Sequence, residues 1–315
     1  MRGELFVVTG ALLWSTGGVG IKLLDGFSPL AVSSGRSLLC GLLFLALARG
    51  RVHFPRQHRA WVFAGIFCYA GVVTAFVLGN RLTTAANTIL LQHTAPLWIA
   101  VLGWALLRER PHVRELLALP LGAGGVLLCV GASGSEGEHA FTGDLIALLS
   151  GVFFAMLTLV LRRLGQHQAA AGAKETSPAF LCLIFGNLLG ALIGLPALIS
   201  SIGEAGVPGQ PVAMGWLLML WLGLGQLGAG YWFFQRGLRT TRALTAGLLN
   251  LIEPILNPVW VALVAGEFPT SRTLVGGAIL MVALTITVSR PRAVKISPHV
   301  AIGSDGASRA NAEKR

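Results

Sequence analysis

The sequence predicts an all-α integral membrane protein with ten transmembrane helices, arranged as two inverted five-helix repeats around a central cavity. Three observations lead to this prediction. Only 12% of the 315 residues are charged and 54% are hydrophobic, whereas about 25% of the residues of a soluble domain are charged. Long apolar runs recur along the chain, and the basic residues collect in alternate gaps between these runs. The two halves of the sequence also resemble each other.

The scarcity of charge excludes several classes of protein. With 24 basic and 13 acidic side chains, a chain of this length cannot form the charged surface of an ordinary soluble enzyme. A disordered chain and a secreted disulfide scaffold are excluded on the same composition. The net charge of +11 raises nucleic acid as a partner. Membrane proteins, however, collect Lys and Arg in their cytoplasmic loops, so the location of the basic residues along the chain must decide between a nucleic-acid partner and a membrane topology signal.

Ten runs are long enough to cross a bilayer, since a helix needs about 20 apolar residues for a hydrocarbon core of about 30 Å. Strands of a membrane barrel would alternate and span about ten residues, whereas these runs are apolar on all sides. The spans predicted in the first half are Leu5–Leu24, Leu30–Ala48, Ala60–Asn80, Ala85–Leu107 and Glu115–Ala132. Those in the second half are Gly143–Leu161, Pro178–Ile199, Ala213–Phe234, Ala243–Gly266 and Thr273–Ser289.

Assigning the loops alternately to two sides of the membrane separates the charges. One side receives 20 of the 24 basic residues: Arg2, Arg49, Arg51, Arg56, Arg59, Arg108, Arg110, Arg114, Arg162, Arg163, Lys174, Arg236, Arg239, Arg242 and six tail residues from Arg290 onward. Lys22, Arg81, Arg272, Asp144 and Glu267 fall on the other side. The positive-inside rule then places both termini in the cytoplasm, as in a bacterial-type inner membrane. The basic residues form a rim and not a patch, which argues against nucleic acid as a partner.

The two halves repeat each other. A shift of 158 positions pairs Thr83 with Thr241 and Pro96 with Pro254. Five spans per half is an odd number, so the second half enters the membrane from the opposite side. Inverted repeats are the usual architecture of secondary transporters, with the substrate site near the midplane between them, although a channel or a structural membrane protein could also be duplicated. The predicted units are residues 1–135, residues 140–290 and a disordered cytoplasmic tail, 291–315.

The repeated segment resembles a known family. The stretch from Leu82 to Trp98, followed by Arg108-Glu109-Arg110-Pro111, is similar to the EamA pattern of the drug/metabolite transporter superfamily. A second copy runs from Arg242 to Pro254 and on to Gly266-Glu267. The resemblance covers nearly the whole chain. It implies a ten-helix carrier of small metabolites, often directed outward, with amino-acid exporters as a prominent branch.

Polar side chains inside the predicted spans are candidates for a substrate site, because hydrocarbon disfavours them. Asn250, Glu253 and Asn257 follow one another at spacings of three and four, on one face of a helix. An ionised carboxylate at the centre of a span costs about 2.5–3.5 kcal/mol unless it is paired, hydrated or protonated. Glu253 is therefore a proton carrier, a partner for a substrate ammonium group, or a structural carboxylate that bonds a neighbouring helix.

Three more polar residues inside the spans are candidates for the same site: Arg36, Gln92 and His93. Arg36 lies inside the second span, as a counter-ion, a partner for a substrate carboxylate, or part of the lining of an outer cavity. The 158-position shift maps Asn250 onto Gln92, so the two amides would face each other across a central cavity. His93 is next to Gln92, and it either contacts the substrate or bonds another helix.

The remaining candidates are uncharged residues that could line the same cavity: Trp14, Ser15, Trp98, Gln226 and Tyr231. Trp14 lies beside Ser15-Thr16-Gly17-Gly18, where missing side chains would open space against the indole ring. The tryptophans form either an aromatic wall for an apolar substrate or part of the core. Pro96, Pro254 and Pro258 each remove a backbone hydrogen bond and kink a helix, as paired hinges beside the cavity or as static kinks.

Cofactor and metal motifs are not recognised in this sequence. The cysteines Cys40, Cys68, Cys129 and Cys182 lie inside predicted spans without metal-ligand spacing, so we expect buried thiols and neither metal nor cofactor. The match of Gly223, Gly225 and Gly228 to G-x-G-x-x-G falls inside a membrane span, and the dinucleotide motif requires a preceding strand. A Walker A sequence and a nucleophile elbow are also missing.

These observations predict a secondary transporter and not an enzyme. It would export small metabolites, with amino acids favoured, including aromatic or apolar ones, by alternating access. Its partners would be a small-molecule substrate, the lipid bilayer and, as a candidate coupling ion, the proton. A multidrug or other metabolite exporter is the alternative within transport, and a membrane-embedded enzyme or lipid-handling protein is the alternative outside it. An enzyme would need ionisable groups in one cluster, whereas Glu253, His93 and Arg36 lie on three different spans.

Overall fold

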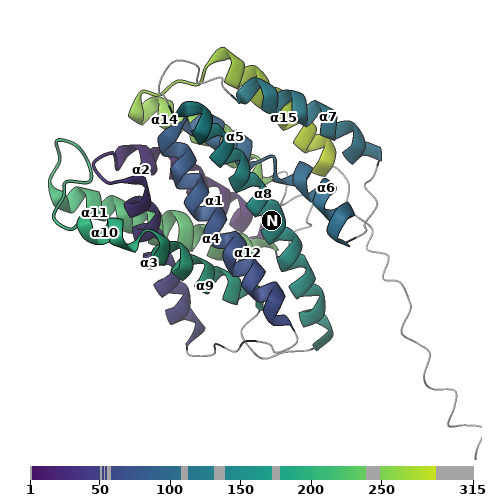
Figure 1. Ribbon diagram of the computed structural model, residues 1–315, viewed down its shortest axis with the longest axis horizontal. Coiled ribbons are helices and arrows are strands. Elements are labelled where there is room, and N and C mark those ends of the chain that lie inside the picture. The colour runs from purple at the N-terminus through teal and green to yellow at the C-terminus, as the bar shows by residue number, and fades with distance from the viewer. Residues whose placement is uncertain are drawn as a thin grey trace, which may run out of the picture.

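The computed structural model describes residues 2–49, 52, 54, 58–107, 113–130, 139–171, 178–238 and 249–288, and every regular element within these ranges is a helix (Figure 1). The first half contains α1 (Arg2–Ser15), α2 (Gly17–Leu23), α3 (Pro29–Ala48), α4 (Arg59–Leu82), α5 (Ala85–Gln92), α6 (Ala95–Leu107) and α7 (Val113–Cys129). The second contains α8 (Ala140–Ala171), α9 (Pro178–Ile193), α10 (Leu195–Ser200), α11 (Val212–Leu220), the π-helix η2 (Trp221–Ala229), α12 (Gly230–Leu238), α14 (Ile252–Ala265) and α15 (Ser271–Val288). The predicted tail, 291–315, lies outside the described residues.

The helices have the length and the surface of membrane spans. By length and composition, five could cross a bilayer, namely Gly3–Leu23, Pro29–Ala48, Arg59–Leu82, Ala140–Leu161 and Val212–Gly237, and four shorter ones are also apolar. Large apolar side chains cover the outside of the bundle: Phe63, Phe67, Leu127 and Leu263 are each more than 60% exposed, as lipid contact requires and water disfavours. The predicted all-helical membrane class is confirmed, and the count of ten spans stays a prediction.

Several predicted spans are broken into shorter helices, for local reasons. The fourth span stops at Gln92 and resumes at Ala95. Pro96 is the second residue of α6. The N–H groups at the start of a helix have no carbonyl partner within the helix, so a proline at this position costs no helical hydrogen bond. Pro254 is likewise in the first turn of α14, after Leu251, which the 158-position shift pairs with His93. The two prolines therefore begin helices at equivalent positions, whereas Pro258 lies inside α14.

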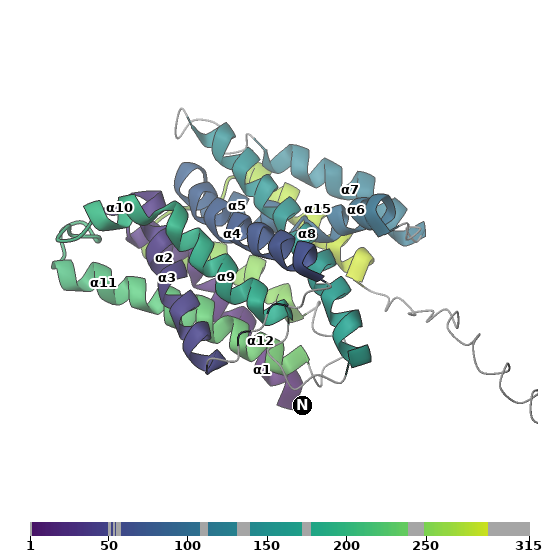
Figure 2. The same ribbon diagram turned by 60° about the horizontal axis from the view of Figure 1, so that its bottom comes forward.

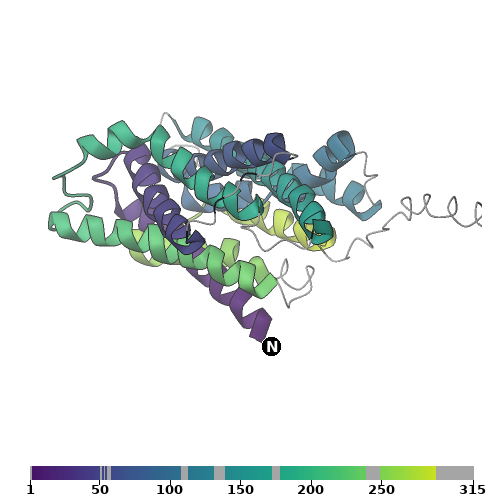
Figure 3. The same ribbon diagram turned by 90° about the horizontal axis from the view of Figure 1, so that it is seen from below.

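Helices of one half pack mainly against helices of the other. The extensive contacts join α4 with α8 and α9, α3 with α9, α1 with α12, and α7 with α15. Figure 2 shows α7 beside α15 and α1 beside α12, and Figure 3 shows α1 (purple) running under the long rod of α11, η2 and α12 (green). In the repeat, α4 corresponds to α12 and α8 corresponds to α1, so the α4–α8 pair has its counterpart in the α12–α1 pair. The α3–α9 and α7–α15 pairs each join two corresponding helices. The duplicated sequence thus folds with matching pairs of helices.

Candidate functional site: a polar cavity between the two halves

A small cavity of about 60 Å³ lies between the two halves of the chain. Eight of the eleven predicted site residues line it: Trp14, Arg36, Gln92, His93, Gln226, Tyr231, Asn250 and Glu253. Apolar side chains complete the lining: Val72, Val73, Phe76, Phe154 and Leu227. The structure thus gathers polar residues from α1, α3, the α5–α6 break, η2, α12 and the segment leading into α14. The apolar members were missed, because nothing in an apolar span distinguishes a residue that faces a cavity from one that faces lipid.

The other three predicted site residues lie behind the wall of this cavity. Ser15 is buried, and its Oγ donates to the carbonyl of Leu12 at 2.8 Å and accepts the indole N–H of Trp260 at 3.0 Å. Trp98 donates its indole N–H to Oγ1 of Thr94 at 3.1 Å. Asn257 is fully buried beside Gly18. These three residues position helices or neighbouring side chains, and the pattern of polar residues in the sequence did not separate them from the lining.

Arg36 is a buried cation without an acidic partner among the described residues. Its side chain is 2% exposed, and Nη2 donates to the carbonyl of Val73 at 3.3 Å. The guanidinium carbon lies 5.7 Å from the centre of the Phe76 ring. The other two nitrogens of the guanidinium, Nε and Nη1, have no hydrogen-bond partner among the described residues. A buried guanidinium is stable only when its charge and its N–H groups are satisfied, so these two groups are available to an anion in the cavity.

Glu253 enters the cavity from α14 and lies close to His93. Its Oε2 is 3.7 Å from Nε2 of His93, and no Lys or Arg of the described ranges forms an ion pair with it. The other ring nitrogen of His93, Nδ1, is 2.9 Å from the carbonyl of Ile89. A carbonyl can only accept, so Nδ1 carries the proton and, in a neutral ring, Nε2 carries a lone pair.

Amide and aromatic groups form the rest of the polar lining. Gln92 donates to Oγ of Ser150 at 2.8 Å, and Gln226 donates to the carbonyl of Trp14 at 3.4 Å. Oε1 of Gln226, Oδ1 of Asn250 and Nε1 of Trp14 are buried and have no partner among the described residues. Buried polar atoms are nearly always hydrogen-bonded in native proteins. Several buried polar atoms without a hydrogen-bond partner around one cavity indicate a site for water or a polar ligand.

The break between α1 and α2 lets two amides approach the backbone. A Cβ atom on Gly18 would overlap Oδ1 of Asn257, and one on Gly17 would lie 2.8 Å from Nε2 of Gln226. The space beside these glycines is therefore filled by amide groups, which corrects the expectation that it opens against the Trp14 ring. Gln226 lies in η2, and π-helical turns often occur at functional sites.

Replacing Gly18 by Ala is expected to lower the stability of the protein by about 1–3 kcal/mol, because Asn257 is buried and must move to make room. Gly124→Ala, on α7, is the matched control. A Cβ atom there meets nothing within 4 Å, so this variant should be as stable as the wild type or slightly more stable. Thermal unfolding in detergent measures both. Equal midpoints for the two variants would contradict the packing of Asn257 on Gly18.

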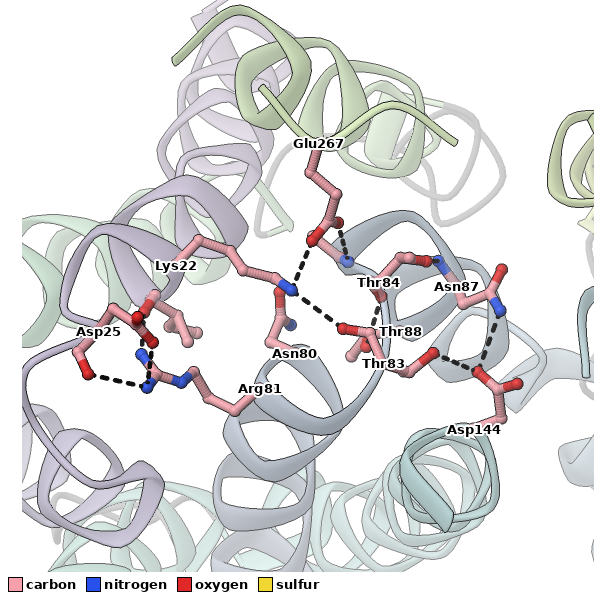
Figure 4. A network of polar contacts seen from close by, with 12 residues as sticks. Lys22, Asp25, Asn80, Arg81, Thr83, Thr84, Asn87, Thr88, Asp144 and Glu267 are labelled. Atoms are coloured by element: carbon pink, nitrogen blue, oxygen red, sulfur yellow. Dashed lines mark hydrogen bonds and ion pairs between the residues drawn. The ribbon is translucent and has the colours of Figure 1, made fainter. Parts of the chain in front are cut away.

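A polar network joins α2, the start of α5, α8 and the segment between α14 and α15 (Figure 4). Nζ of Lys22, on α2, lies 2.5 Å from Oε2 of Glu267 and donates to the carbonyl of Thr83 at 3.0 Å. Oε1 of Glu267 accepts the backbone N–H of Ala85 at 2.7 Å. The Lys22–Glu267 pair therefore ties α2 and the start of α5 to the segment between α14 and α15.

The same network continues through a buried carboxylate. Oδ1 of Asp144 accepts from Oγ1 of Thr83 at 2.7 Å and from Nδ2 of Asn87 at 3.0 Å. Thr273 donates to Oδ1 of Asn87 at 2.8 Å. Asp144 and Thr273 belong to the second half of the chain, so the network joins both halves. The loop assignment placed Lys22, Asp144 and Glu267 on one side of the membrane, but it did not indicate that they meet.

Buried apolar side chains follow the cavity lining along α4. They belong to a cluster that includes Ile21 on α2, Leu24 directly after α2, Val77 on α4, and Ile89 and Leu90 on α5. Along α4, the residues run from the cavity (Val73 and Phe76) through Val77 to the network at Thr83. Apolar packing, followed by hydrogen bonds and an ion pair, therefore lies between Phe76 and the Lys22 end of α4.

A second cavity, of about 400 Å³, lies between α5, α14 and α15 and is lined almost entirely by apolar side chains. Pro254 and Pro258 line it, on the face of α14 that also carries the exposed Ile255 and Val259. Two of the three predicted hinge prolines therefore face this apolar groove and not the polar cavity. Their role as hinges stays a prediction.

The fold and the cavity define an all-helical membrane protein with a polar cavity between two similar halves. Comparisons with known proteins identify the family. The model of the EamA-like transporter family matches residues 1–131 and again residues 141–289. The chain therefore belongs to the EamA-like transporter family, and its function class is membrane transport of small molecules.

Several relatives share this family along most of their length. The chain is 26% identical over 309 residues to the uncharacterized transporter YwfM of Bacillus subtilis, covering 94% of this chain and 97% of that protein. It is 27% identical over 285 residues to an uncharacterized transporter of Archaeoglobus fulgidus, covering 90% and 95%. A solved crystal structure covers 90% of this chain and 95% of its own with a TM-score of 0.57 and 19% identity, which shows a shared fold.

Proposed function

We propose that this protein is a secondary transporter that exports small zwitterionic metabolites, above all amino acids, across a bacterial-type inner membrane. One observation carries the proposal: a single cavity contains a guanidinium and a carboxyl group, and neither has an oppositely charged Lys, Arg, Asp or Glu partner among the described residues. Arg36 and Glu253 come from α3 and α14, and they are not ion-paired with each other. A zwitterion supplies both missing partners at once.

The proposed substrate fits the chemistry of the lining. Its carboxylate would accept from Nε and Nη1 of Arg36, an arrangement that guanidinium groups favour. Its ammonium group would pair with Glu253. The rings of Trp14 and Tyr231, whose centroids are 4.8 Å apart at an angle of 67°, offer an apolar surface to an aliphatic or aromatic side chain.

Transport would proceed by alternating access between two inverted five-helix units, with ten spans and both termini in the cytoplasm. The ion pair and the apolar cluster at the Lys22 end support this proposal, because a carrier must keep one end closed while the other is open. The breaks before α6 and α14 offer paired positions for bending, at Pro96 and Pro254. The Lys22 end would face outward, in agreement with the charge distribution of the loops.

Counterflow in proteoliposomes tests the proposal. Liposomes loaded with one unlabelled amino acid should transiently accumulate the labelled form, and the uptake should saturate. Lack of uptake for all twenty common amino acids would overturn the substrate class. Counterflow of cationic dyes in its place would indicate a multidrug exporter. Movement of labelled phospholipid between leaflets, or chemical conversion of a supplied compound, would indicate a lipid-handling protein or an enzyme, which the clustering of Arg36, His93 and Glu253 makes worth measuring.

A further inference from the structure

Glu253 and His93 form an ionisable pair that spans the two halves of the chain inside the cavity. Both are buried, with side chains about 10% exposed. Oε2 of Glu253 faces Nε2 of His93 at 3.7 Å, and Nε2 has no hydrogen-bond partner among the described residues. Because Nδ1 is engaged by the carbonyl of Ile89, the atom that faces Glu253 is the basic nitrogen of the ring.

We propose that Glu253 and His93 share one proton in the substrate-free protein, and that a substrate ammonium group replaces this proton. The carboxyl group of Glu253 would carry the proton and donate it to Nε2 of His93. Shortening the present distance by about 0.5–1 Å brings the two atoms to hydrogen-bond length. A proton neutralises the buried carboxylate, which has no Lys or Arg beside it in the described ranges, and gives Nε2 a donor.

The surroundings of Glu253 leave the proton and the substrate as its two charge partners. The helices packed against α14 are α1, α2 and α5. The ionisable residues of α1, Arg2 and Glu4, lie in its first turn, at the opposite end of the helix from the cavity residue Trp14. α5 carries no ionisable side chain, and Lys22 on α2 is occupied by Glu267. Arg36 on α3 and Tyr231 on α12 line the same cavity, but neither forms an ion pair or a described hydrogen bond with Glu253.

The exchange of proton for substrate is balanced and needs no further reactant. When the zwitterion binds, the O–H bond of Glu253 breaks, the proton passes to water, and the carboxylate pairs with the ammonium group. His93 keeps the proton on Nδ1 throughout. One proton thus leaves for each zwitterion that enters, which couples export to the inward movement of protons. This second half of the proposal rests on the proposed function.

Infrared spectroscopy of the substrate-free protein tests the shared proton without any transport. We expect a carbonyl stretching band of a protonated carboxyl group at pH 7 that is absent in Glu253→Gln. In His93→Gln the band should remain and move to the frequency of a carboxyl group with a weaker acceptor. Glu204→Gln, at an exposed position between α10 and α11, is the control and should leave the band unchanged. A band that survives in Glu253→Gln, or that is identical in His93→Gln, would overturn the proposal.

Proton release on binding tests the exchange. With L-phenylalanine as the probe and a pH indicator in weakly buffered detergent solution, we expect one proton released per molecule bound, and an affinity that falls about tenfold for each unit by which the pH is lowered where the carboxyl group is protonated. His93→Gln should shift this pH profile, which a purely structural residue would not do. Binding without proton release would overturn the exchange. If L-phenylalanine does not bind, the amino-acid class of the proposed function fails, while the infrared result decides on the shared proton independently.

Discussion

Replacing Arg36 by Met is expected to abolish transport of amino acids without destabilising the protein. The guanidinium of Arg36 is buried, and its single described hydrogen bond is to the carbonyl of Val73. Charge-assisted hydrogen bonds contribute about 1.5–3 kcal/mol, so removing them should weaken binding of a carboxylate roughly 10- to 150-fold. A hydrophobic residue of similar length removes a buried charge, which is often neutral or stabilising by about 1–4 kcal/mol.

Counterflow and thermal unfolding, measured on the same preparation, test this prediction. Arg36→Lys should recover little activity, because an ammonium group cannot form two parallel hydrogen bonds with a carboxylate. An amine that lacks the carboxylate, such as phenethylamine, is the control probe, and its binding should be nearly unaffected by Arg36→Met. Normal amino-acid transport by Arg36→Met would remove Arg36 from the site. A large loss of stability with loss of transport would assign it a structural role.

Removing the negative charge of Glu267 is expected to open the Lys22 end of the bundle. Glu267→Gln breaks the ion pair with Lys22 and weakens the hydrogen bond from the N–H of Ala85 (Figure 4). The pair is partly buried, each side chain being 19% exposed, so we expect a loss of about 1–2 kcal/mol from the closed state. That shifts the balance between closed and open forms roughly 5- to 30-fold.

Cysteine labelling measures this shift. In a background in which the four native cysteines are replaced by Ala, Val73→Cys places a thiol in the cavity lining. A membrane-impermeant maleimide added on the Lys22 side should react roughly 5- to 30-fold faster in Glu267→Gln. Exchanging the charges, with Lys22→Glu and Glu267→Lys together, should restore only part of the protection, because an ammonium group at position 267 cannot accept the N–H of Ala85. Equal labelling rates in all three proteins would show that the network does not hold this end closed.

The sequence predicted the helices well because their signal is local. Apolar length and the alternation of basic loops are properties of short segments. Pro96 and Pro254 were expected to kink their spans, and the structure has both in the first turn of a helix. The internal repeat also indicated that Gln92 and Asn250 would meet, and the structure brings both to one cavity. Eight site candidates share that cavity because each carries a polar group inside an apolar span, where few alternatives to a cavity exist.

What the sequence could not supply is the rotation of each helix about its axis. Trp14 and Ser15 are neighbours in the sequence, and both were predicted to line the cavity. Trp14 does line it, whereas Ser15 accepts a hydrogen bond from the indole of Trp260. Arg36, His93 and Glu253 were predicted for one cavity, but the approach of His93 to Glu253 was not, since different spans carry them and only packing brings the two side chains together. The π-helix that positions Gln226 could not be predicted either, because the glycines of this segment are its only unusual feature in the sequence.

A structure of the protein with a bound amino acid tests the central claim most directly. We expect the carboxylate within hydrogen-bond distance of Nε and Nη1 of Arg36, and the ammonium group beside Glu253, within the cavity between the two halves. An amino acid bound elsewhere, for example in the apolar groove between α5, α14 and α15, or bound with its ammonium group toward Arg36, would contradict the account.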